Sequence, residues 1–120
     1  MEILKEIGLV LFAVPFVLSG ISHLLNRNAM AVYAQFKRVP LPLTSTVVSG
    51  IILIVAPILI VFGVIPEIAL GVLAAFLIVT SFFMHNFWSV SDESRVSEQI
   101  NFNKNIGLAG AALALLALLS

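Results

Sequence analysis

Four long apolar runs limit what this chain of 120 residues can fold into. The runs cover residues 3–25, 44–62, 68–87 and 103–120. A helix of about 20 mainly apolar residues crosses the ~30 Å hydrocarbon core of a bilayer, and each run is close to that length. Unpaired backbone groups are too costly in lipid for any spanning structure except helices and closed barrels. The runs lack the alternation of barrel strands, so they predict four membrane-spanning helices.

The composition agrees with a chain that lies almost wholly in the membrane. Of its residues, 61% are hydrophobic and 10% are charged, whereas soluble domains have about 25% charged residues. We therefore expect residues 1–120 to form a single transmembrane domain with an all-α fold, an integral membrane four-helix up-down bundle. The N-terminus lacks a convincing A-x-A-like cleavage site, so the first run is interpreted as a span and not as a signal peptide.

Charge and cysteine content exclude several classes of function. Six basic and six acidic residues give a formal net charge of zero, so no basic patch indicates nucleic acid. The chain contains no cysteine. Disulfides, thiol redox chemistry and sites that hold metal through cysteine are therefore excluded together.

The connection between the first two runs has the pattern of a short amphipathic helix at the membrane interface. Its apolar and aromatic residues recur at helical spacing: Ala29, Val32, Tyr33 and Phe36. Pro40 and Pro42 are expected to end this helix before the second span.

Lysine and arginine are distributed unevenly between the two ends of the predicted bundle. Five lie in the long connections or at the start of the fourth run: Arg27, Lys37, Arg38, Arg95 and Lys104. The opposite side carries Lys5 alone. By the positive-inside rule, we predict that the connections 26–43 and 88–102 are cytoplasmic and that both termini lie outside.

The polar residues of the spans gather at this predicted cytoplasmic end. His23 ends the first run and His85 ends the third, and an up-down bundle places these two ends on the same side. Ser19 and Ser81 each precede one of the histidines by four residues, so each pair shares a helix face.

The polar end has several interpretations. In the first, its residues lie at the lipid–water boundary, with Trp88 as an interfacial aromatic. In the second, His23, His85 and Trp88 contact a quinone or similar aromatic ligand, because a neutral imidazole can hydrogen-bond a carbonyl and relay a proton near pH 7. A metal or haem is a third, but two histidines are a thin ligand set, and we predict no metal site. A partner-binding surface or a transport path completes the alternatives.

Five segments of the chain resemble the DoxX family of small four-helix membrane proteins in order and spacing. They are FVLSGISHLL, VPLPLT, SGIILIVAPILIVFGVIPEIAL, FFMHNFWSV and EQINFNKNIGLAGAALAL. The resemblance covers roughly residues 8–120, and its most specific parts are His85-Asn86-Phe87-Trp88 and Phe102-x-Lys104-Asn105 with Gly110. It implies a four-helix bundle in a prokaryotic plasma membrane. The family is named for a subunit of an archaeal terminal quinol oxidase, and a related subunit belongs to a thiosulfate:quinone oxidoreductase.

The chain departs from the pattern of this family at three positions. Many relatives have a lysine at the position of His23, a glutamate at that of Leu53 and an arginine at that of Glu67. These differences favour a structural or accessory role over autonomous catalysis.

The resemblance and the polar end together predict an accessory subunit of a quinone-linked membrane electron-transfer system. No cofactor is expected to be covalently held, quinone is the candidate ligand, and enzymatic activity is left open. The expected partners are the lipid bilayer, an oxidoreductase catalytic subunit and a second copy of the chain. A non-enzymatic membrane scaffold or assembly factor is the alternative, and a small-molecule transporter is a second.

We also predict a hydrogen-bonded polar corner at the cytoplasmic end. It comprises Ser19, Ser81, His85, Asn86, Lys104 and Asn105. Lys104 and Asn105 should pack beside His85 and Asn86, because the two motifs flank one short connection. The small residues of the fourth run, among them Gly107 and Gly110, are expected to let helices pack closely inside the bundle, with a dimer face as the alternative.

Overall fold

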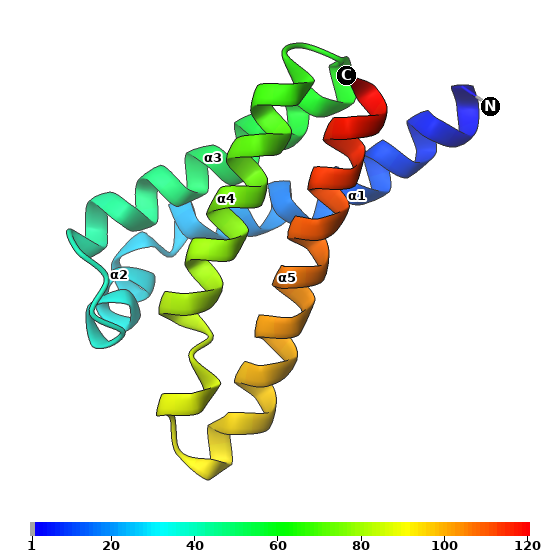
Figure 1. Ribbon diagram of the computed structural model, residues 1–120. Helices are drawn as coiled ribbons and strands as arrows, with labels where there is room; N and C mark the ends of the chain where they lie inside the picture. Colours follow the sequence, from blue (N-terminus) through cyan, green and yellow to red (C-terminus); the bar gives the residue numbers. More distant parts are fainter. Residues whose placement is uncertain (1) are drawn as a thin grey trace.

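The computed structural model describes residues 2–120, whose regular elements are all helices (Figure 1). They are α1 (Glu2–Leu25), α2 (Arg27–Phe36), α3 (Pro42–Phe62), α4 (Pro66–Met84), the short 3-10 helix η1 (Phe87–Ser89) and α5 (Asp92–Leu119). Four segments, α1, α3, α4 with η1, and α5, are long and apolar enough to cross a membrane. The prediction of an all-α membrane fold with four spans, and a short helix between the first two, is confirmed.

The four long helices pack in series. Helix α1 packs along α3, α3 packs on α4, and α4 packs along α5, while α2 packs mainly on α3. Figure 1 shows that the pair α1–α3 crosses the pair α4–α5, and that the first turns of α1 project beyond α5 in this view. Since α1 and α5 make no extensive contact, the bundle is open between them. A buried apolar cluster joins the pairs: Leu9, Phe16, Leu53, Ile60, Leu70, Leu73, Leu77, Ala109 and Ala112 are among its members.

Two glycines bring α1 and α3 into close contact. A Cβ atom added at Gly20 would lie 2.7 Å from the carbonyl oxygen of Gly50, and one added at Gly50 would lie 3.0 Å from the Cβ of His23. The glycines of α5 differ, because a Cβ atom at Gly107 or Gly110 would meet nothing within 4 Å. Close packing through glycine therefore occurs between α1 and α3. In α5 the two glycines face outward, and the small residues that pack inside the bundle are Ala109 and Ala112.

Helix α5 begins much earlier than the apolar run suggests. It starts at Asp92, where the spacing Ser89-x-x-Asp92 indicates a possible helix start, and not near Asn103, and no glycine or proline interrupts residues 92–106. Its 28 residues correspond to a length of about 42 Å, more than the ~30 Å hydrocarbon core requires. The extra turns lie beside the end of α4, and they carry the acidic residue around which the polar end is built.

Candidate functional site

A buried carboxylate at the polar end of the bundle is bound from two sides. Lys37 Nζ donates a hydrogen bond to Oε2 of Glu98 at 3.0 Å and another to Oδ1 of Asn86 at 2.7 Å. His85 Nδ1 lies 3.2 Å from Oε1 of Glu98. The side chains of Lys37 and Glu98 are 4% and 11% exposed, and that of His85 is 24% exposed. We call these four residues the Lys37–Glu98 network.

Helix ends position each member of this network. Lys37 is the residue that follows α2. Its backbone N–H donates to the carbonyl of Tyr33, and its positive charge interacts favourably with the dipole at the C-terminus of α2. His85 follows α4, with its N–H bonded to the carbonyl of Ser81. Asn86 precedes η1, and Glu98 lies in the second turn of α5. Three chain segments that are distant in sequence therefore meet at one carboxylate.

Burial makes the members of the network depend on one another. A charge removed from water costs several kcal/mol unless it is paired and hydrogen-bonded. Both oxygens of Glu98 have partners, and no fully buried side-chain nitrogen or oxygen among residues 2–120 lacks a hydrogen bond. The arrangement holds an imidazole and an ammonium group each within direct hydrogen-bonding distance of one carboxylate, which is the chemistry that proton transfer requires.

A groove of about 520 Å³ lies beside the network, between α2 and the start of α5. Lys37 and Glu98 belong to its lining, together with Tyr33, Phe36, Ser89, Val90, Ser91, Glu93, Ser94 and Ser97. The rings of Tyr33 and Phe36 stack with centroids 6.4 Å apart, and the Lys37 ammonium lies 5.6 Å from the centre of the Tyr33 ring. Aromatic faces, serine hydroxyls and the buried ion pair thus border the same space.

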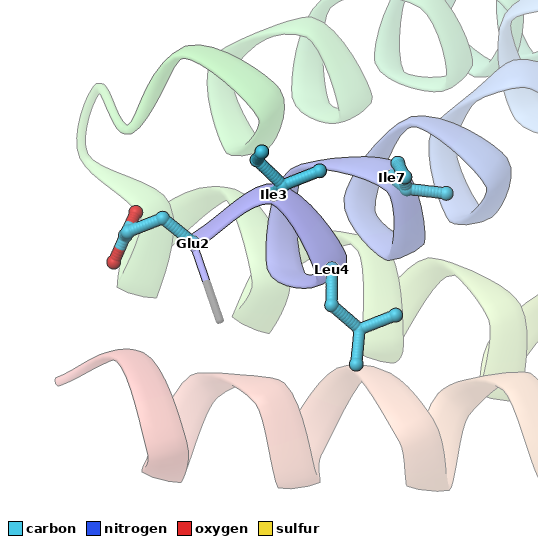
Figure 2. Close-up of a pocket in the computed structure, with 4 residues that line it drawn as sticks. All are labelled: Glu2, Ile3, Leu4 and Ile7. Atoms are coloured by element: carbon cyan, nitrogen blue, oxygen red, sulfur yellow. The ribbon is translucent and has the colours of Figure 1, made fainter.

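A second cavity lies at the opposite end of the bundle. Figure 2 shows its four lining residues on the first turns of α1: Glu2, Ile3, Leu4 and Ile7. Its volume is about 540 Å³, but its walls are exposed apolar side chains and a single carboxylate. Because a ligand site needs several converging polar groups to orient its ligand, this cavity is not the candidate site.

Trp88 lies in a cluster of four aromatic side chains. Its ring centroid is 5.9 Å from that of Phe82, 5.2 Å from Phe87 and 5.6 Å from Phe102. Most of these contacts are edge-to-face, the arrangement that aromatic rings favour. The cluster holds η1 against α5, and the indole does not line the groove.

This cluster allows a test of the packing at the polar end. We expect Phe102→Ala to lower the free energy of unfolding by about 3 kcal/mol, because it removes a large side chain from a packed cluster. Trp88 is the single tryptophan, so a red shift of its emission in detergent micelles should accompany the loss. Phe83→Ala is the control, since among residues 2–120 the ring of Phe83 makes no aromatic contact with the rings of the cluster. Equal red shifts in the two variants would contradict this description of the cluster.

The residues expected to contact a quinone do not share one cavity among the described residues. His23 Nδ1 lies 2.8 Å from the carbonyl oxygen of Ser19 in its own helix, and no hydrogen bond joins it to His85 within residues 2–120. His85 belongs to the network, and Trp88 belongs to the aromatic cluster. Their role as quinone contacts stays a prediction.

The polar corner contains Lys37 in place of the expected cation, Lys104. His85 and Asn86 are bound by Glu98 and Lys37, and no hydrogen bond joins them to Lys104 or Asn105 within residues 2–120. Lys104 follows Glu98 by six residues, which places it about 9 Å further along α5 and about 240° around it, where it is exposed.

Two other expected members of the corner, Asn105 and Ser81, lie deeper in the bundle, whereas Ser19 is exposed on α1. Asn105 follows Glu98 by seven residues, so it shares the face of Glu98 about two turns deeper and is buried. Ser81 is also buried, and its hydroxyl donates to the carbonyl of Leu77 in its own helix. Sequence reasoning missed Lys37 and Glu98. The spacing of Glu98 and Asn105 on one face of a longer helix was the signal that could have found the acid.

No metal centre is present in the part of the chain that the structure describes. Residues 2–120 contain no group of three or more histidine, aspartate or glutamate side chains placed to hold a metal ion. The candidate site is therefore the Lys37–Glu98 network with its adjoining groove.

The fold and this site define a small multi-pass helical membrane protein with an ionic network at one end. The chain belongs to the DoxX family, whose model matches residues 7–86. It is similar to Inner membrane protein YphA of Escherichia coli (strain K12), with 24% identity over 100 residues that make up 83% of this chain and 71% of that protein. No solved structure matches the chain at a significant level. Glu98 lies beyond the residues that match the family model.

Proposed function

We propose that this DoxX protein is an accessory subunit of a quinone-linked electron-transfer system in a prokaryotic cell membrane, and that the groove between α2 and α5 receives the quinone ring. The observation that carries the proposal is a buried carboxylate, bound by an ammonium and an imidazole, beside an aromatic groove at one end of a membrane bundle.

The groove offers what a quinone ring requires. Its volume of about 520 Å³ lies within the ~300–1,000 Å³ that is usual for ligand sites. The stacked rings of Tyr33 and Phe36 suit a flat aromatic ligand. An ammonium has three donors, and Lys37 uses two of them within the network. The third donor of Lys37 and the serine hydroxyls can serve the carbonyls of a quinone.

The network supplies groups that can accept and release protons when a quinone exchanges electrons with a partner subunit. One oxygen of Glu98 borders the groove through its contact with Lys37, and the other oxygen is bound to His85. A histidine near neutral pH can take up or release a proton. Glu98 would accept the proton at the groove, and His85 would pass it toward the partly exposed side of its ring.

The main alternative is a non-enzymatic membrane scaffold or assembly factor. It is favoured by the observation that the network is satisfied within the protein, so it needs no ligand to be stable. A transporter has less support, because the polar side chains buried in the spans, Thr46, Ser81 and Asn105, lie toward the polar end, and the large buried cluster that joins the helices is apolar.

The test is quinone binding by the protein purified in native lipid. We expect quinone in the lipid extract, and quenching of Trp88 fluorescence on addition of a short-chain benzoquinone such as decylubiquinone. Phe36→Ala should weaken this binding at least tenfold. Val32→Ala is the control, since Val32 is exposed on the same helix and does not line the groove. No quinone in the extract and no quenching would reject the site, and a stable complex whose activity is unchanged by Glu98→Gln would support the scaffold.

The orientation of the bundle is open to a labelling test. The chain has no cysteine, so single substitutions give unambiguous reporters. We expect a membrane-impermeant maleimide to label Glu67→Cys in intact cells, and Gln99→Cys only after permeabilisation, because the lysine and arginine bias places the start of α5 in the cytoplasm. Both positions are exposed. The reverse pattern would show that the bundle is inserted the other way round.

A further inference from the structure

We propose that the Lys37–Glu98 ion pair is a releasable tie between two halves of the molecule, and that breaking it lets α2 move away from α5. The first half comprises α1, α2 and α3, and the second comprises α4, η1 and α5. The proposal concerns a conformational change of the protein itself and does not depend on quinone binding.

The polar interactions between the two halves converge on one nitrogen atom. Within residues 2–120, the side-chain hydrogen bonds that join the halves run from Lys37 Nζ to Asn86 and to Glu98. The remaining side-chain hydrogen bonds lie within one half. Extensive packing between the halves is confined to α3 and α4. Removal of one ammonium group therefore leaves α2 without a polar link to the second half.

The bilayer around the spans gives this link unusual weight, although Lys37 and Glu98 themselves lie in the connections beyond the spans. Apolar contacts between helices gain little in a bilayer, because lipid tails are as apolar as the side chains that they replace. The groove of about 520 Å³ separates α2 from the start of α5, so close packing does not hold these elements together there. The ion pair, with both side chains nearly buried, is the interaction that closes this end.

The chain around Lys37 is built to move as a unit with α2. Residues 37–41 separate α2 from α3 without helical structure, and Arg38 and Leu41 have positive φ angles of 62° and 47°. A lysine side chain has a long flexible stem, so its ammonium can leave Glu98 and reach water near Tyr33.

Loss of the negative charge on Glu98 is the event that releases the tie. The charged groups that face this carboxylate are Lys37, from the end of α2, and His85, from the end of α4. Glu93 of its own helix lines the same groove. A proton delivered to Glu98, or a ligand that donates a hydrogen bond to it, weakens the attraction of Lys37 and opens the groove.

The experiment measures the distance between the halves in lipid nanodiscs. Spin labels at Gln35→Cys and Gln99→Cys, which are exposed and outside the groove lining, report on α2 and α5. We expect one narrow distance distribution with the native tie. Lys37→Met and Glu98→Gln should each add a population that is longer by at least ~5 Å, about the rise of one helix turn. Unchanged narrow distributions in both variants would overturn the proposal.

Three controls keep the result interpretable. Labels at Val79→Cys and Gln99→Cys, both in the second half and both exposed, should show no change in any variant. Arg38→Met removes the adjacent exposed cation and should leave the narrow distribution intact, whereas Lys37→Arg should retain it by keeping the charge. Should Lys37→Met fail to fold, Glu98→Gln decides the outcome, because glutamine differs from the protonated acid only by an NH2 group in place of the hydroxyl.

Discussion

Replacement of Lys37 by methionine is expected to lower the free energy of unfolding by about 3 kcal/mol. Removal of one partner from a buried ion pair leaves the other charge uncompensated, which costs ~3–5 kcal/mol. The cost should fall at the lower end, because Glu98 keeps its contact with His85. The measurement is unfolding in mixed micelles by titration with sodium dodecyl sulfate, followed by far-UV circular dichroism.

Two comparisons make this prediction specific. Arg38→Met removes an exposed cation next to Lys37 and should change the unfolding free energy by less than ~0.5 kcal/mol. The double variant Lys37→Met/Glu98→Gln should lose less than the sum of its single variants by roughly 1–3 kcal/mol, as expected for residues in contact. Additive losses would mean that the two side chains do not interact as the structure describes.

The second large effect is expected at the contact between α1 and α3. Gly20→Ala should lower the unfolding free energy by about 2 kcal/mol, because overpacking a tight contact costs ~1–3 kcal/mol. Its new methyl group would lie 2.7 Å from both the carbonyl oxygen of Gly50 and the Cγ1 of Ile54. Backbone atoms cannot rotate aside as a flexible side chain can, so the two helices must separate. The same detergent titration measures the loss.

Gly8 provides a matched control in the same helix. A Cβ atom at Gly8 would meet nothing within 4 Å, so Gly8→Ala should leave stability unchanged or raise it by up to ~1 kcal/mol through helix propensity. A destabilisation by Gly8→Ala as large as that by Gly20→Ala would attribute the effect to glycine itself and not to the crossing of the helices.

The spans were predictable because the bilayer imposes a local rule. Each span needs a continuous apolar run of about 20 residues, whatever its neighbours are. The same reasoning placed α2, since an amphipathic pattern and two prolines are local features. It indicated a helix start near Asp92 but did not show that this polar helix and the fourth span are one continuous helix, α5. A polar segment carries no apolar signal, so its continuation of the fourth span is visible only in the fold.

The site was predictable only in part. His85 and Asn86 were singled out because they directly follow a long apolar run and belong to the most specific motif of the family resemblance, and both belong to the network. Their partners were not found, because Lys37 lies 49 residues from Asn86 and 61 residues from Glu98 along the chain. Such pairings depend on the packing of helices. The face of Lys104 follows from its spacing of six residues from Glu98 once both are known to lie in one helix.

The amino-acid sequence alone determined that the chain spans a membrane with four helices and has one polar end. Those properties follow from the bilayer as a solvent, because the backbone N–H and C=O groups of each apolar run must form hydrogen bonds within that run. The tertiary structure decided which charges meet. It places α2 of one half against α5 of the other and thereby brings Lys37 to Glu98. A buried ion pair depends on distance and desolvation, and both are set by how the helices pack.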